Sequence, residues 1–179
     1  GFGEPVRVVE TSTASKTAGL NLGDEAATSF PRCYIDADVQ VDLDTVRKVA
    51  ALLDAGEALA AAPRMKVDLS GASWPARAFY AIWLRQPYHG PGMIGGGFYA
   101  LSEAGRARFG RFPSIIADDE FVRSHFTQEE RATPVGCEFT ITAPRTLGDV
   151  IRVKTRSRLG TYQLRRTIPE RAAGSRAKG

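Results

Sequence analysis

Helical and extended spacings of apolar residues alternate along the first half of this chain. Residues 6–10 alternate as a strand, and residues 34–39 are rich in β-forming side chains. Between them, residues 16–27 place small and polar side chains on an apolar helical period. Asp42 is a typical N-cap for a second helix over residues 43–61, which the proline that follows is expected to end.

The second half mixes the two spacings. Glycines cluster from residue 90 to residue 97 and predict a loop that leads into a strand. Gly160 is a candidate break in a long basic helix, and the small, polar, basic tail from Pro169 is expected to be disordered. The pattern predicts an α/β sandwich with a mixed sheet. The expected strands are 64–70, 98–101 and 136–143. The expected helices are 75–86, 103–110 with Ser102 as its N-cap, 118–126 and 147–166.

Composition indicates an ordinary globular domain. The chain has 179 residues, of which 43% are hydrophobic and 25% are charged. It contains no apolar run of about 20 residues and no signal-peptide pattern, so a single soluble domain is expected. Cys33 and Cys137 lie in separate segments without disulfide-framework or metal-type spacing, which favours a reduced, cytoplasmic setting.

Basic residues gather in the C-terminal third of a chain with a net charge of +4. Such a cluster suits a diphosphate, an anionic membrane surface or nucleic acid. No nucleic-acid-binding motif occurs, and the aromatic residues are not interleaved with the basic ones, so nucleic acid is not an expected partner. A peripheral membrane contact through the basic C-terminal helix is expected instead.

Asp36 and Asp38 form an Asp-x-Asp pair at the end of the predicted strand over residues 34–39. Hard cations such as Mg²⁺ and Mn²⁺ prefer oxygen ligands, and Mg²⁺ takes only one or two protein carboxylates together with substrate phosphates. The pair is therefore a candidate site for a divalent metal (Mn²⁺ or Mg²⁺) that holds a phosphorylated substrate.

Several motifs accompany this pair in a fixed order. A Lys-x-x-x-Leu-Asn stretch begins at Lys16, glycines 95–97 lead into a strand, Asp118 and Asp119 follow, and a basic segment covers residues 152–160. Across residues 7–166 the set resembles the family 2 glycosyltransferases, which are inverting enzymes of GT-A fold. The resemblance implies a nucleotide-sugar donor and a glycan or lipid-linked acceptor. It also makes residues 1–168 the C-terminal portion of a GT-A domain, without its first nucleotide-binding βαβ unit, and residues 169–179 a basic tail.

The resemblance assigns roles on the donor side of the site. Asp36 maps to the nucleotide ribose, Asp38 to the metal, and Lys16 lies near the nucleotide. Arg156 and Arg158 occupy the place of a Gln-x-x-Arg-Trp element of processive relatives, without its tryptophan. Arginine suits bidentate phosphate contacts, so both are candidates to clamp the diphosphate, and a solvated basic helix face is the alternative.

The resemblance also assigns the acceptor side. Asp119 maps to the general base that removes the acceptor proton, and Asp118 helps to bind the acceptor or to orient its neighbour. Gly95, Gly96 and Gly97 let the backbone approach donor sugar and acceptor closely. Helix capping is the alternative role of the acidic residues that begin at Asp118.

Other interpretations remain open. The Asp-x-Asp-x-Val sequence also fits haloacid-dehalogenase-type phosphatases, with Ser70 at the end of a later strand, but no lysine follows between Val67 and Val153. A non-catalytic basic interaction module is a second alternative. His89 and His125 stand where no motif requires a metal ligand, so surface or packing roles are expected for both.

Overall fold

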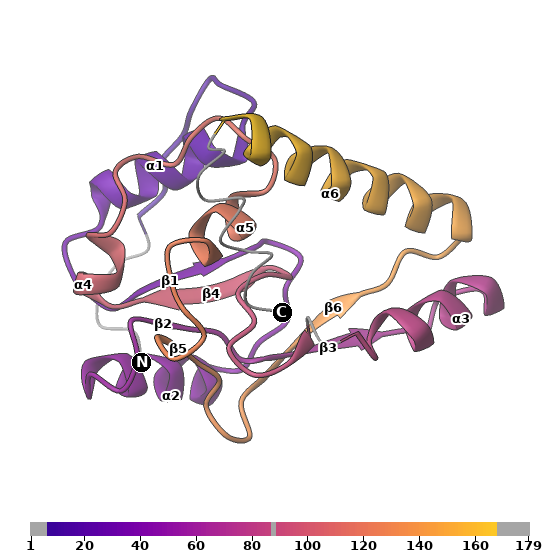
Figure 1. Cartoon of the computed structure of the whole chain (residues 1–179), viewed down its shortest axis with the longest axis horizontal. Helices are drawn as coiled ribbons and strands as arrows, with labels where there is room; N and C mark the ends of the chain where they lie inside the picture. Colours follow the sequence, from indigo (N-terminus) through magenta and orange to yellow (C-terminus); the bar gives the residue numbers. More distant parts are fainter. Residues whose placement is uncertain (1–6, 87–88, 168–179) are drawn as a thin grey trace.

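Two small sheets organise the chain in the computed structural model, which describes residues 7–86 and 89–167 (Figure 1). One sheet has four strands in the order β1-β4-β2-β5, with β4 antiparallel to both neighbours and β2 parallel to β5. The other consists of β3 and β6, which run parallel. The strands are β1 (Arg32–Ile35), β2 (Ala60–Ala61), β3 (Arg64–Asp68), β4 (Phe98–Leu101), β5 (Arg131–Ala132) and β6 (Glu138–Thr142).

Strand β4 lies in the middle of the core, and all four of its residues are buried. Side chains alternate along a strand, so Tyr99 and Leu101 point to one side and Phe98 and Ala100 to the other. The first pair packs in a cluster with aromatic residues of the loop and helix that follow β4, including Phe109. The second pair packs against α2 and β6. A strand buried on both faces explains the continuous apolar run in its sequence.

Helices cover both faces of the four-stranded sheet (Figure 1). Helix α2 lies against one face, and α1, α5 and α6 lie on the other side of β4. Asp42 and Ser102 each accept a hydrogen bond from the backbone N–H three residues later, so both predicted N-caps are confirmed. The helices are α1 (Lys16–Ala26), α2 (Leu43–Asp54), α3 (Trp74–Trp83), α4 (Glu103–Arg106), α5 (Asp118–Arg123) and α6 (Leu147–Thr167).

The mixed α/β architecture with helices around a mixed sheet is as expected, but several predicted elements are wrong in extent. Helix α2 ends at Asp54 because Gly56 adopts a φ of 73°, and residues 60–61 form β2 instead of helix. Strand β1 ends at Ile35. Helix α6 continues through Gly160.

The strand predicted at residues 6–10 is also wrong as far as the structure describes it. Residues 7–10 form no strand, and Val8 is 76% exposed. A segment with alternating apolar and polar residues forms no strand when no partner strand lies beside that segment. The tail predicted to be disordered lies outside the described residues. No helix within residues 7–86 and 89–167 is long and apolar enough to cross a membrane.

Candidate functional site

An ion-pair cluster joins three segments that are far apart in the sequence. The ammonium group of Lys16, the first residue of α1, lies 2.8 Å from Oδ1 of Asp36 and 3.1 Å from Oδ2 of Asp118. A cation at a helix N-terminus is unfavourable in the field of the helix dipole, so the two carboxylates offset that cost. Burial alone would lower the pKa of Lys16, but the charge of Asp118 and the contact with Asp36 raise it above its usual value.

Asp36 takes its position from the end of β1. Its backbone N–H donates to the carbonyl of Gly97 at 2.8 Å, and its own carbonyl accepts from the N–H of Val39. The first bond extends the pairing of β1 with β4 by one step, and the second closes a turn. The Asp-x-Asp pair therefore lies in the turn after the strand, with Asp36 half-buried and Asp38 exposed.

The backbone conformation of residues 95–97, opposite this turn, requires glycine. Gly95, Gly96 and Gly97 have φ angles of 149°, 78° and 108°, a region that side chains rarely adopt. A Cβ on Gly97 would lie 2.7 Å from Cγ2 of Val39 and 3.4 Å from a carboxylate oxygen of Asp36. The absence of side chains therefore lets β4 approach the Asp-x-Asp turn.

Asp118 is the most deeply buried carboxylate of the cluster, at 3% exposure. Burial raises the pKa of Asp118 to about 6; the Lys16 ammonium opposes this shift, and the charge of Asp119 adds to it. An ion pair by itself would lower the pKa of the acid, so desolvation outweighs the ion pair here. A carboxyl group that titrates near neutrality can accept or release a proton under physiological conditions.

Tyr99 of β4 brings a buried hydroxyl to the same region. Its side chain stacks on Tyr34, and its hydroxyl has no hydrogen-bond partner among the described residues. Burial raises the pKa of Tyr99 well above its usual value, and the negative charge of Asp118 adds to the shift. A buried hydroxyl without a partner is costly, which makes it a candidate contact for a bound ligand.

Helix α6 holds the segment that carries Asp118. A Cβ on Gly160 would come within 2.9 Å of the backbone nitrogen of Ala117, so the two backbones approach closely only because glycine is present. The hydroxyl of Thr161 donates to Glu120 at 2.6 Å. The helix N-terminus that carries the acidic residues is therefore fixed from the C-terminal half of α6.

The remaining predicted acidic residues, Asp38 and Asp119, are outside the ion pairs that Lys16 forms. Asp119 is half-buried, and its Oδ1 accepts the backbone N–H of Glu120 at 2.8 Å. Within the described residues, no group of three or more His, Cys, Asp or Glu side chains is placed to hold a metal ion. A Mg²⁺ site needs only one or two carboxylates when substrate phosphates supply the other ligands, and the Asp-x-Asp turn fits that arrangement.

Arg156 and Arg158 both lie on the exposed surface of α6. Because α6 is continuous, two residues this close in sequence project to different sides of the helix. Arg156 is one turn before Gly160 and shares its side, which faces the segment before Asp118. Arg158 lies on another side, so the structure does not bring the two guanidinium groups together, and their joint diphosphate clamp stays a prediction.

Comparison with protein-family models, curated proteins and solved structures finds no match to this chain. The resemblance to family 2 glycosyltransferases therefore rests on the sequence motifs alone.

Asn21 of the motif set and the two histidines outside it make packing and backbone contacts. Asn21 is buried, and its amide exchanges two hydrogen bonds with the backbone of Phe112. His125 is buried against Phe109 and Phe121, and the ring of His89 lies 4.1 Å from that of Trp83, centroid to centroid. The packing roles expected for the histidines agree with these contacts.

Proposed function

We propose that this chain takes part in transferring a sugar from a nucleotide-sugar donor to an acceptor hydroxyl, with inversion, on a GT-A-like scaffold. The supporting observation is the position of the Lys16 ammonium between Asp36 and Asp118. These residues come from separate motifs, and the family resemblance assigns all of them to the donor and acceptor sites. The backbone of Asp36 also bonds to Gly97, so residues of several motifs of the resemblance meet here, which supports the proposal.

The donor side of the proposed site is the turn that carries Asp36 and Asp38. Asp36 would accept a hydrogen bond from the ribose, and Lys16 would contribute positive charge near the nucleotide. A divalent cation held by Asp38 and the donor phosphates would stabilise the charge on the diphosphate as the sugar leaves.

The acceptor side is the N-terminus of α5. Asp119 is the proposed general base, which takes the proton of the acceptor hydroxyl as its oxygen bonds to the anomeric carbon. The bond to the diphosphate breaks on the opposite face of the sugar. Asp118 and Lys16 would position the base.

The phosphatase interpretation has less support. Ser70 follows β3 in the other sheet, where its hydroxyl donates to Asp68 and its carbonyl accepts from Arg77. These contacts build a turn, and none of them joins Ser70 to the Asp-x-Asp pair.

The proposal is tested by calorimetric titration of the chain with uridine diphosphate and guanosine diphosphate, each with Mn²⁺. Binding that depends on the metal is expected for at least one of them. Asp38→Ala should abolish it, whereas Asp119→Asn should leave it intact. In a sugar-transfer assay with the corresponding nucleotide sugars, Asp119→Asn should reduce the rate by roughly 10²–10⁴-fold, the usual contribution of a general base.

Asp54→Asn is the matched control, because this carboxylate is exposed at the end of α2 and should affect neither measurement. If neither nucleoside diphosphate binds with Mn²⁺, the interpretation as a non-catalytic module replaces the proposal. Equal loss of binding in Asp38→Ala and Asp119→Asn would remove Asp119 from the role of base.

A further inference from the structure

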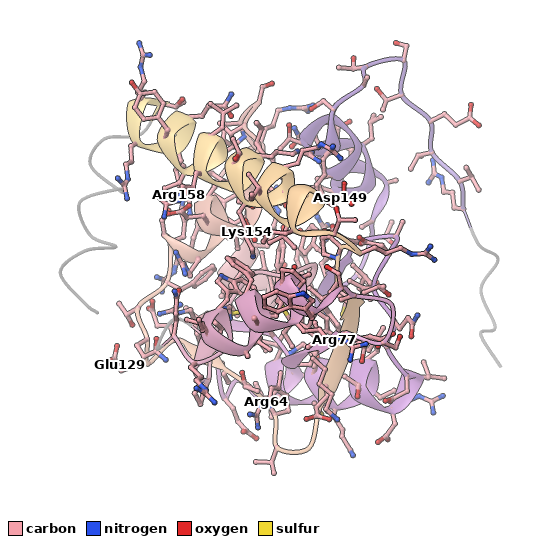
Figure 2. All side chains as sticks on the ribbon, turned by 90° about the vertical axis from the view of Figure 1, so that its right-hand side faces the viewer. Arg64, Arg77, Glu129, Asp149, Lys154 and Arg158 are labelled. Atoms are coloured by element: carbon pink, nitrogen blue, oxygen red, sulfur yellow. The ribbon has the colours of Figure 1, made fainter. Side chains whose placement is uncertain are left out.

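The N-terminal part of α6 contacts α3, and both helices lie on one side of the molecule (Figure 2). Val150 of α6 packs in one cluster with Ala76 and Tyr80 of α3. Lys154 lies between the helices, with its ammonium nitrogen 3.3 Å from the ring centroid of Trp83. The two helices are therefore held together as one surface, which we call the α3/α6 face.

Large apolar side chains are exposed on this face. On α3, Trp74 is 80% exposed and Ile82 is 68% exposed. They are eight residues apart, so their directions around the helix axis differ by about 80°. Ile151 and Leu159 repeat this spacing on α6, and Tyr162 is exposed near them. Single exposed apolar residues are normal, but a group on adjacent helices marks an interaction surface.

Basic residues outnumber acidic ones along the two helices of this face. The sequence contains no acidic residue from 69 to 86 or from 150 to 167. The first acidic residue before this stretch of α6, Asp149, is already paired with Arg152 at 2.8 Å. The basic residues of the two stretches are Arg77, Arg85, Arg152, Lys154, Arg156, Arg158, Arg165 and Arg166.

We infer that the α3/α6 face docks onto an anionic lipid surface. Tryptophan and tyrosine settle at the headgroup level of a bilayer, isoleucine and leucine reach the acyl boundary, and arginine pairs with lipid phosphates. Nucleic acid would use the arginines but would leave the aliphatic side chains without a complementary surface. A second copy of the chain would bring two positive faces together. The docking face is independent of the sugar-transfer proposal, so either can fail alone.

Co-sedimentation with vesicles tests the inference, using phosphatidylcholine alone and phosphatidylcholine with phosphatidylglycerol. The chain is expected to bind the anionic vesicles and not the zwitterionic ones, and binding should weaken as salt is raised. Arg158→Gln with Arg165→Gln should reduce the partition coefficient by about fivefold for each arginine. Trp74→Ser with Ile82→Ser should reduce it by about tenfold or more through lost apolar burial.

A control variant combines Arg47→Gln and Val135→Ser, which remove an exposed cation of α2 and an apolar side chain that is 97% exposed on a loop. It should bind as the unmodified chain does. The fluorescence of Trp74 should shift to the blue on anionic vesicles, and Trp74→Phe should remove that shift.

Several results would overturn the inference. These are the absence of binding to anionic vesicles at low salt, equal loss in the control variant, or an unchanged partition in the apolar variant. Release from vesicles by a DNA duplex, with the apolar variant binding that duplex normally, would assign the face to nucleic acid. Concentration-dependent dimerisation abolished by the apolar variant, without lipid binding, would assign it to a second copy.

Discussion

Replacing Asp118 with asparagine is expected to change how stability depends on pH. Burial raises the pKa of this carboxyl from 3.8 to about 6 on folding. Between these values the folded chain keeps a proton that the unfolded chain has lost, so the free energy of unfolding falls as pH rises. Above about pH 6 the carboxylate is ionised in both states, and the cost of burying its charge is fully present. Asparagine cannot ionise and does not incur this loss.

The expected size of the effect follows from the shift. A difference of about 2 pKa units corresponds to about 3 kcal/mol, of which about 2 kcal/mol develops between about pH 4.5 and pH 7.5. Solvent screening removes little of it because Asp118 is almost fully buried. Lys16 loses one partner in the variant, but its side chain is exposed, so this loss is below about 1 kcal/mol and varies little over that range.

Urea unfolding followed by circular dichroism at several pH values measures the effect. The quantity to compare is the stability of Asp118→Asn minus that of the unmodified chain, because other titrating groups cancel in the difference. This difference should rise with pH, whereas the same difference for the exposed Asp54→Asn should stay flat. A flat difference for Asp118→Asn as well would refute a buried, proton-binding carboxyl at this site.

Three further predictions concern backbone contacts and a second buried charge. Gly97→Ala should lower the free energy of unfolding by about 1–3 kcal/mol, because its backbone is strained and the new Cβ would clash with Val39. Gly23→Ala, in open space on a helix, should raise the free energy of unfolding by about 0.5–1 kcal/mol. Thermal unfolding compares the two variants. Gly160→Ala should loosen α6 and lower the free energy of unfolding by about 1–3 kcal/mol. Gly148→Ala, with ordinary contacts in the same helix, should not destabilise the chain. Equal protection of the α6 amides from hydrogen exchange in the two variants would contradict this reasoning. Burial lowers the pKa of Lys154 from 10.5 to about 8, so the folded chain loses this proton at lower pH than the unfolded chain does. The free energy of unfolding should therefore rise from about pH 8 to about pH 10.5. Urea unfolding at these two pH values should show no such rise for Lys154→Met.

Local signals made part of this fold predictable. N-cap residues located the start of α2 and α4, and the apolar run after the glycines located β4. The alanine-rich stretch before Pro63 was misleading because alanine has the highest helix propensity. There Ala60 and Ala61 are fully buried beside β4, and this packing outweighs propensity and makes them a strand.

The candidate site was predictable only as a set of residue types. Asp36, Asp118 and Lys16 were identified through the order of the motifs, but no spacing shows that one ammonium group contacts both carboxylates. The burial of Asp118 depends on the contact of α6 with residues 116–117, which a local sequence pattern does not show. Tyr99 was not predicted to bind a ligand, because an aromatic residue in a buried strand is usually core.

The pairing of the strands constrains the order in which the chain can fold during synthesis. In the part of the chain that the structure describes, no strand pairs with the next strand in the sequence: β1 and β2 pair with β4, β2 also with β5, and β3 with β6. Contacts of such high sequence separation form late and fold slowly. Until β4 has left the ribosome, no strand has a partner, and β3 keeps an open edge until β6 follows. A nascent chain that stops after α5 would therefore expose an unpaired strand edge, the kind of surface from which aggregation begins.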